Sequence, residues 1–186
     1  MIDRGSVIRT LALGCVLLAA VGCSVAADRA ATPPDSRVSV TFVQPERFTD
    51  VRDSLLASPK GTADLLAEID RYLHTVGARY VPAGLTLDVR ITNIDLAGEF
   101  EPWRGPQFDR VRIMRDVYPP RFALEFRLTD ARGAVVKEGQ RVLLDQLYLS
   151  AAALNNGDPL YYDKLLLGAW LRQEFSASTQ ASRFSP

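Results

Sequence analysis

The sequence predicts an α+β fold: a two-layer sandwich of about five mostly antiparallel strands, with two helices on one face. Apolar residues alternate with polar ones in four short segments, and a fifth segment over 135–149 also has the character of a strand. In two other segments apolar residues recur every three or four residues, as on one face of a helix. The order is β-α-β-β-β-β-α. Short turns join the later strands, which favours antiparallel pairing, and each helix needs one side of the sheet to cover its apolar stripe.

A strand and a helix come first. In the strand, apolar residues occupy alternate positions from Val38 to Phe42, and Pro45 follows. The helix begins near Thr62 and is stopped by Gly77 and then Pro82. Its apolar side chains recur at helical spacing: Leu65, Ile69, Leu73 and Val76. A parallel pairing of the first strand, through a right-handed crossover, would place this helix over the sheet.

The second strand covers residues 85–96, where apolar residues again alternate with polar ones. The apolar positions shift by one residue between Ile91 and Ile94, and a bulge near Asn93 would explain the shift. Residues 97–109 follow as a long loop that contains two glycines and two prolines.

The second half of the chain predicts three strands and a helix, over residues 111–113, 122–128, 135–149 and 158–175. The sequence from Asp130 to Gly133 predicts a hairpin turn, with glycine where a positive φ is needed. The last strand is expected to bend at Gly139. Asp158 and Pro159 are typical of a helix start, as the N-cap and the first helical residue.

The first 23 residues have the order of a secretory signal peptide. Arg4 and Arg9 precede an apolar run over 11–22, which leads into Cys23 through Ala20-Val21-Gly22. This run is too short to span about 30 Å of hydrocarbon as a stable helix. The segment therefore predicts export, and a permanent transmembrane segment is not expected.

Two ways of processing this leader compete. Cys23 follows a small residue, as in a bacterial lipobox, although Ala20 occupies the position where the usual lipobox has leucine. Cys23 would then be lipidated and become the N-terminus, and Ser24 resembles the residue found in lipoproteins that are sorted to the outer membrane. In the alternative, signal peptidase cleaves after Ala26 or Ala27 and releases a soluble periplasmic or secreted protein.

The mature chain is expected to fold as one domain over residues 38–175, after a flexible spacer over 24–37 and before a disordered tail over 176–186. About 150 residues suffice for one well-filled core, and no intramolecular disulfide can form once Cys23 is lipidated or removed. Loss of residues 1–23 takes away two arginines and one aspartate and leaves a formal charge near −1. This charge gives no general attraction to nucleic acid, and no nucleic-acid partner is expected.

The chain offers few residues for catalysis, metals or cofactors. His74 is the only histidine, and as a general base it would need a nucleophile and an orienting acid beside it. Zinc needs clusters of cysteine or histidine, and no phosphate-binding glycine loop is present. The segment 155–158 is better explained as a loop and helix cap than as a calcium site, and the spacing of Glu99 and Glu101 is ordinary for a turn. No catalytic, cofactor-binding or metal-binding residue is therefore predicted, and no cofactor is expected.

The long loop and the residues after it provide the candidate interaction surface: Phe100, Trp103, Arg104, Phe108 and Arg112. Aromatic and arginine side chains dominate protein–protein hot spots. In the alternative, the aromatic residues fold back over an open end of the core, and the arginines pair across the open sheet face with Asp88 and Glu125. That face is expected to carry six charged residues: Asp88, Arg90, Arg110, Arg112, Glu125 and Arg127.

Four parts of the chain carry a resemblance to a known family. They are residues 38–50 (VSVTFVQPERFTD), 95–99 (DLAGE), 115–121 (RDVYPPR), and 160–164 (LYYDK) followed by Trp170-Leu171. Together they resemble an exported bacterial family, domain of unknown function 3016, over roughly residues 38–175. The family has no assigned activity, so the resemblance implies a secreted or periplasmic role and no catalytic residue. Its usual Tyr-Glu-Lys stands here as Tyr162-Asp163-Lys164, with a shorter acid.

The sequence as a whole predicts an exported, lipid-anchored cell-envelope protein. It would act as an interaction module in the periplasm, tethered to the outer membrane and in contact with another envelope protein. One alternative is a periplasmic protein that binds a small ligand in an apolar pocket between the helices and the sheet. The other is a hydrolase, in which His74 would have to meet a hydroxyl and a carboxylate in one cleft.

Overall fold

The computed structural model describes residues 37–150 and 157–181. Several predicted segments lie outside the described residues: the leader over 1–23 with Cys23, the spacer up to residue 36, Asn155 and Asn156, and the part of the predicted tail over 182–186.

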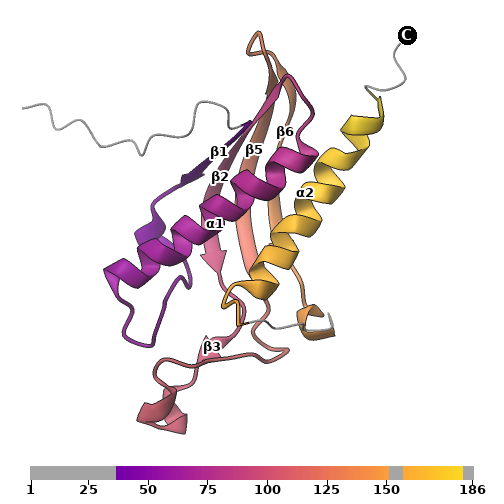
Figure 1. The fold of residues 1–186 in the computed structure, drawn as a ribbon. Coiled ribbons are helices and arrows are strands. Elements are labelled where there is room, and N and C mark those ends of the chain that lie inside the picture. Colours follow the sequence, from indigo (N-terminus) through magenta and orange to yellow (C-terminus); the bar gives the residue numbers. More distant parts are fainter. Residues whose placement is uncertain (1–36, 151–156, 182–186) are drawn as a thin grey trace, which may run out of the picture. The chain divides into compact units, whose positions relative to one another are not determined.

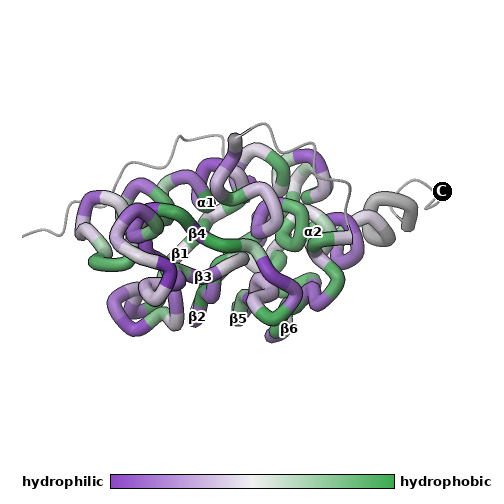
Figure 2. The backbone as a smooth tube through the Cα atoms, turned by 90° about the horizontal axis from the view of Figure 1, so that it is seen from below, coloured by the Kyte–Doolittle hydropathy of each residue, from purple (hydrophilic) through white to green (hydrophobic). Residues whose placement is uncertain are grey.

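The described part of the chain forms two layers: a four-stranded sheet, and two helices that lie on one of its faces (Figure 1). The sheet order is β1-β2-β5-β6, and the strands are Val38–Phe42 (β1), Leu85–Asp95 (β2), Arg121–Asp130 (β5) and Val135–Leu144 (β6). The helices are Pro59–Tyr80 (α1) and Tyr161–Ala181 (α2). β1 is parallel to β2, and the other neighbours are antiparallel. Figure 2 shows the layers end-on, with both helices on one side of the strands. The predicted α+β sandwich is thereby confirmed.

The predicted bulge and hairpin turn are both present. The pairing of β2 with β5 shifts register between Ile91 and Asn93, where the apolar pattern changes phase. At the turn between β5 and β6, Gly133 has a φ of 80°. The Asp130 carboxylate accepts hydrogen bonds from the backbone N–H groups of Arg132 and Ala134, at 2.8 and 2.9 Å. Local sequence therefore sets this turn.

Two predicted strands differ in the structure. Residues 111–113 do not join the main sheet, because β4 (Arg112–Ile113) pairs with β3 (Glu99–Phe100) in a small separate sheet. The last strand, β6, ends at Leu144, and a 3-10 turn, η4 (Tyr148–Ser150), follows it. Within β6, Gly139 lies opposite Phe126, and a Cβ atom there would be 3.2 Å from the Phe126 ring. The glycine thus gives that ring the room to pack against the strand.

The second helix begins and ends later than predicted. Asp158 Oδ1 accepts a hydrogen bond from the Leu160 N–H at 2.9 Å in the turn that precedes α2, and the helix itself begins at Tyr161. Its backbone continues to Ala181, beyond the predicted end near Phe175.

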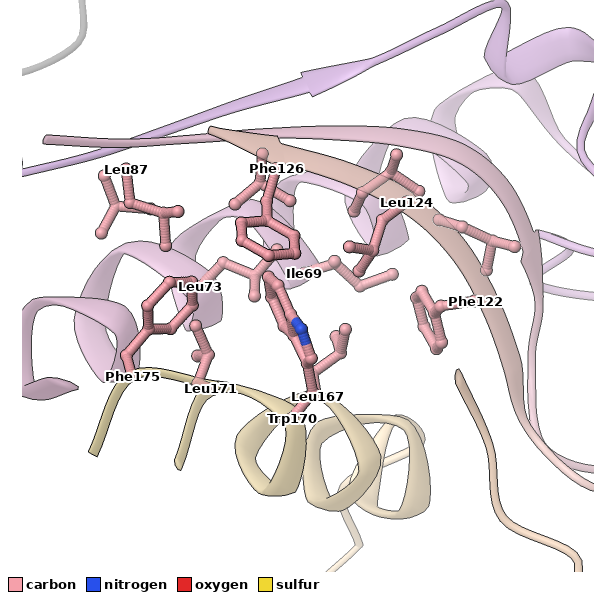
Figure 3. Close-up of a cluster of buried hydrophobic side chains, with 14 of the residues drawn as sticks. Ile69, Leu73, Leu87, Phe122, Leu124, Phe126, Leu167, Trp170, Leu171 and Phe175 are labelled. Atoms are coloured by element: carbon pink, nitrogen blue, oxygen red, sulfur yellow. The ribbon is translucent and has the colours of Figure 1, made fainter. Parts of the chain in front are cut away.

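The hydrophobic core lies between the sheet and the two helices (Figure 3). Trp170 and Phe175 of α2 meet Phe126 of β5 edge-on, with ring centroids 6.0 and 5.6 Å from that of Phe126. From α1, Ile69 and Leu73 are fully buried in the same cluster. These side chains fill the space in which the small-ligand alternative places its pocket.

Candidate functional site

The segment between β2 and β5 lies beyond one end of the sheet, and its residues 97–118 are called the end loop (Figure 1). The end loop contains β3, β4 and two 3-10 turns, η2 (Pro102–Arg104) and η3 (Pro106–Phe108). All the residues of the predicted interaction surface belong to it. The structure sorts them into an inner group, which holds the loop in place, and an outer group, which faces solvent.

Arg112 is the centre of the inner group. Its Nη1 donates hydrogen bonds to Asp50 Oδ2 and to the Gly98 carbonyl, both at 2.8 Å, and its Nη2 donates to the Arg52 carbonyl at 3.0 Å. Asp50 is only 3% exposed and also accepts a 2.8 Å hydrogen bond from Arg52 Nε. Burial alone would raise the pKa of Asp50, but the hydrogen bonds and charges of Arg112 and Arg52 outweigh it and lower the pKa. Asp50 therefore stays ionised between two arginines.

Phe100 belongs to the same inner group. It is 4% exposed, and the guanidinium carbons of Arg112 and Arg52 lie 4.7 and 5.7 Å from its ring centroid. Arg52 also donates to Glu99 Oε1 at 2.7 Å. Phe100 and Arg112 are thus part of the attachment of the end loop, and they are not part of an exposed surface.

The charges of the open sheet face pair differently from the prediction. Arg110 and Arg112 lie in the end loop, and neither belongs to a strand of the main sheet. Arg112 bonds to Asp50. On the sheet itself, Arg90 lies 3.3 Å from Glu125. Farther along, Arg127 lies 3.1 Å from Glu138 of β6. These are exposed pairs, which contribute little to stability.

In the outer group, Arg104 is held by Glu101, whose own side chain is fully buried. Arg115 reaches both of its carboxylate oxygens, with Nη2 to Oε2 and Nε to Oε1 at 2.8 Å. Arg104 Nε donates to Oε2 of the same carboxylate, and the Tyr118 hydroxyl lies 3.5 Å from Oε1. We refer to Glu101, Arg104 and Arg115 as the arginine clamp. It fixes two guanidinium groups beside the turn that carries Trp103.

Trp103 forms the exposed tip of the end loop. Its side chain is 70% exposed, although it is the largest apolar side chain of the loop. The side chains of Arg104 and Arg115, which both bond to Glu101 two positions before Trp103, are 40% and 43% exposed. The Arg104 guanidinium lies 5.7 Å from the ring centroid of Phe108, which is half-buried. The tip thus combines an exposed indole with two anchored arginines.

Asp163 is not among the site residues predicted from the sequence. It lies in the first turn of α2 and is 1% exposed. Its Oδ1 accepts a hydrogen bond from the Ala97 N–H at 3.1 Å, and this bond joins α2 to the start of the end loop. Its Oδ2 has no hydrogen-bond partner among the described residues. Burial raises the pKa of Asp163 to about 7, against the opposing effects of the Ala97 N–H and the Arg112 charge. The one signal for Asp163 in the sequence is the family resemblance, in which Tyr162-Asp163-Lys164 stands in place of the usual Tyr-Glu-Lys.

The residues considered for catalysis are paired in other ways. His74 lies on α1, with Nε2 3.4 Å from Asp70 Oδ1. Glu99 is paired with Arg52, and Glu101 with Arg104 and Arg115. Over residues 37–150 and 157–181, no group of three or more His, Cys, Asp or Glu side chains is arranged to hold a metal ion. Among the helices of that same part, none is long and apolar enough to cross a membrane.

Fold and site together define a two-layer α+β domain with an arginine-clamped loop at one end of its sheet. The chain belongs to the protein family of unknown function DUF3016, whose model matches residues 36–173. This confirms the family that the sequence resembles.

Comparisons with individual proteins add one structure. No curated protein is significantly similar to the chain. Among solved structures, the chain is similar to a minor lipoprotein from Acinetobacter baumannii, with 13% sequence identity and a TM-score of 0.26. The match covers 76% of this chain and 91% of that one.

Proposed function

We propose that this chain is an exported, lipid-anchored cell-envelope protein whose end loop binds another envelope protein through Trp103. The single observation that carries the binding proposal is the exposed indole on an anchored loop. Export and the anchor at Cys23 rest on the leader pattern of residues 1–23.

An exposed tryptophan beside arginines is the composition of an interaction hot spot. The indole is 70% exposed, so a partner that covers it would remove a large apolar area from water. The arginine clamp and the Arg112–Asp50 contact hold the loop that presents it. Less conformational freedom is then lost when the partner binds, which favours affinity.

Photo-crosslinking tests this proposal in cells. A benzoylphenylalanine residue in place of Trp103 should form a discrete adduct with one envelope protein on irradiation. The matched control carries the same group at Val142 of β6, which is 60% exposed on the main sheet. The proposal requires the adduct at position 103 and its absence at position 142. Equal adducts at both positions, or none at position 103, would contradict it.

The anchor has its own test. The intact mass of the mature protein should show acyl groups on Cys23, and a Cys23→Ala variant should lose them and leave the membrane fraction. A free N-terminus at Ala27 or Asp28 would instead establish the soluble form.

A further inference from the structure

We infer that the partner of the end loop presents a protein carboxylate to Arg104 and Arg115, beside an apolar group that covers Trp103. This inference rests on the proposed function and specifies the chemistry of the partner. It starts from the charge balance of the arginine clamp, in which one buried carboxylate faces two guanidinium groups. One positive charge is left over at a position where both arginines reach solvent.

The arginines retain donors that the clamp does not use. Arg104 contacts Glu101 through Nε, and Arg115 does so through Nε and Nη2. Within the described part of the chain, no hydrogen bond is made by the Nη1 and Nη2 groups of Arg104 or by the Nη1 group of Arg115. Their N–H groups form a ready set of donors for a second carboxylate, which a guanidinium binds with two parallel hydrogen bonds.

Both arginines are also fixed before any partner arrives. Their common acceptor, Glu101, is fully buried and immediately precedes η2, so the guanidinium groups are held at one place. An arginine side chain that is already ordered loses less rotamer entropy on binding. The arrangement therefore favours a specific contact over a diffuse one.

A protein carboxylate fits this surface better than a lipid membrane does. Attraction to an anionic membrane grows with the number of basic residues near its surface. Residues 101–118 carry four arginines but also three carboxylates, Glu101, Asp109 and Asp116. A loop of such mixed charge is attracted only weakly to an anionic membrane surface. Two guanidinium groups and one indole instead match a single acidic side chain next to an apolar one.

Peptide selection tests the inference on the purified mature chain. A phage-displayed library should yield peptides in which Asp or Glu lies next to an apolar residue. Binding of these peptides should fall about tenfold when Arg104→Lys and Arg115→Lys are combined. Lysine keeps the positive charge but cannot donate two parallel hydrogen bonds to a carboxylate as a guanidinium does. The control combines Arg90→Lys and Arg127→Lys, which alter two exposed arginines on the sheet and should leave binding unchanged. If the double clamp variant fails to fold, Arg104→Lys alone replaces it, because both Arg115 contacts to Glu101 remain.

The outcomes separate the inference from the proposed function. Selected peptides without acidic residues, a failure to select any peptide, or binding unaffected by the lysine variants would overturn the inference. Vesicles of phosphatidylglycerol and phosphatidylethanolamine serve as the membrane arm, and binding to them that depends on Arg104 would overturn it in favour of lipid. If the crosslink from position 103 persists in the lysine variant, the proposed function stands without the inference. If no crosslink forms at all, both fall.

Discussion

Arg112 ties the end loop to the rest of the domain through Asp50. The two residues are 62 positions apart in the chain, and their side chains meet at 2.8 Å with the carboxylate 3% exposed. The same guanidinium bonds to two backbone carbonyls, at Gly98 and Arg52. One side chain thus connects β4, the segment that follows β1, and the beginning of the end loop.

Replacing Arg112 should therefore destabilise the domain strongly. Arg112→Met leaves the buried carboxylate of Asp50 with one arginine instead of two, and we expect a loss of about 3 kcal/mol in the free energy of unfolding. Urea unfolding followed by circular dichroism measures it. The control is Arg127→Met, which breaks the exposed pair with Glu138 and should cost less than about 1 kcal/mol. Similar losses in the two variants would argue against a structural role for the Arg112–Asp50 contact.

Asp163 should make the domain less stable as the pH rises. Its pKa is about 7 in the folded protein against an ordinary value of 3.8, so the folded state binds the proton more tightly than the unfolded state does. The contribution of protonated Asp163 to the free energy of unfolding is complete below the pKa of this carboxyl in the unfolded chain. It is lost as the pH rises through the pKa in the folded protein. Between about pH 4 and pH 7 the loss should approach roughly 1 kcal/mol per pH unit from this group.

The Asp163→Asn variant should lose that part of the pH dependence, because an amide does not titrate. Free energies of unfolding at about pH 5 and about pH 7.5, for the variant and the unaltered chain, give the comparison. Asp88→Asn, on the open face of β2, is the control. An unchanged difference between the two pH values in Asp163→Asn would exclude this carboxyl as its source.

The sheet and the helices could be predicted because their signals are local. The bulge between Ile91 and Asn93 appears in the sequence as a change in the phase of alternation, and Asp130 and Gly133 determine their turn within a few residues. Such patterns reflect which face of an element is buried. They need no knowledge of distant parts of the chain.

The inner part of the site could not be predicted in this way. The alternation that continues from Arg110 predicts Arg112 on the sheet, yet its partner Asp50 comes from a segment far away in the sequence. Asp163 carries no local sign of burial, since it stands between a tyrosine and a lysine in the first turn of a helix. Its burial arises only in the folded domain, where the Ala97 N–H from the start of the end loop donates to its carboxylate.

Gly77 should be required by the contact between α1 and β1. A Cβ atom at this position would lie 2.9 Å from Cγ2 of Val38, which is fully buried. Alanine would otherwise favour the helix by about 1 kcal/mol over glycine. We expect the clash to outweigh this gain, so that Gly77→Ala lowers the free energy of unfolding by about 1–3 kcal/mol.

A double-mutant cycle isolates this contact. Adding Val38→Ala removes the clashing methyl groups, so the effect of Gly77→Ala should turn from destabilising to neutral or stabilising in that background. Chemical denaturation of the four proteins gives the coupling free energy. A coupling near zero would mean that the two residues do not constrain each other.

Trp103 and Phe100 provide the sharpest test of the division between outer and inner residues, because they lie in the same loop. Trp103 is 70% exposed and Phe100 is 4% exposed beneath two arginines. Trp103→Ala should change the free energy of unfolding by less than about 0.5 kcal/mol, whereas Phe100→Ala should cost about 3 kcal/mol. Thermal and urea unfolding provide the measurement.

A stable Trp103→Ala protein is also what the binding experiments need, since any lost interaction then belongs to the missing indole. If Trp103→Ala proved as destabilising as Phe100→Ala, the indole would be a structural part of the loop, and its exposure would not indicate a binding surface.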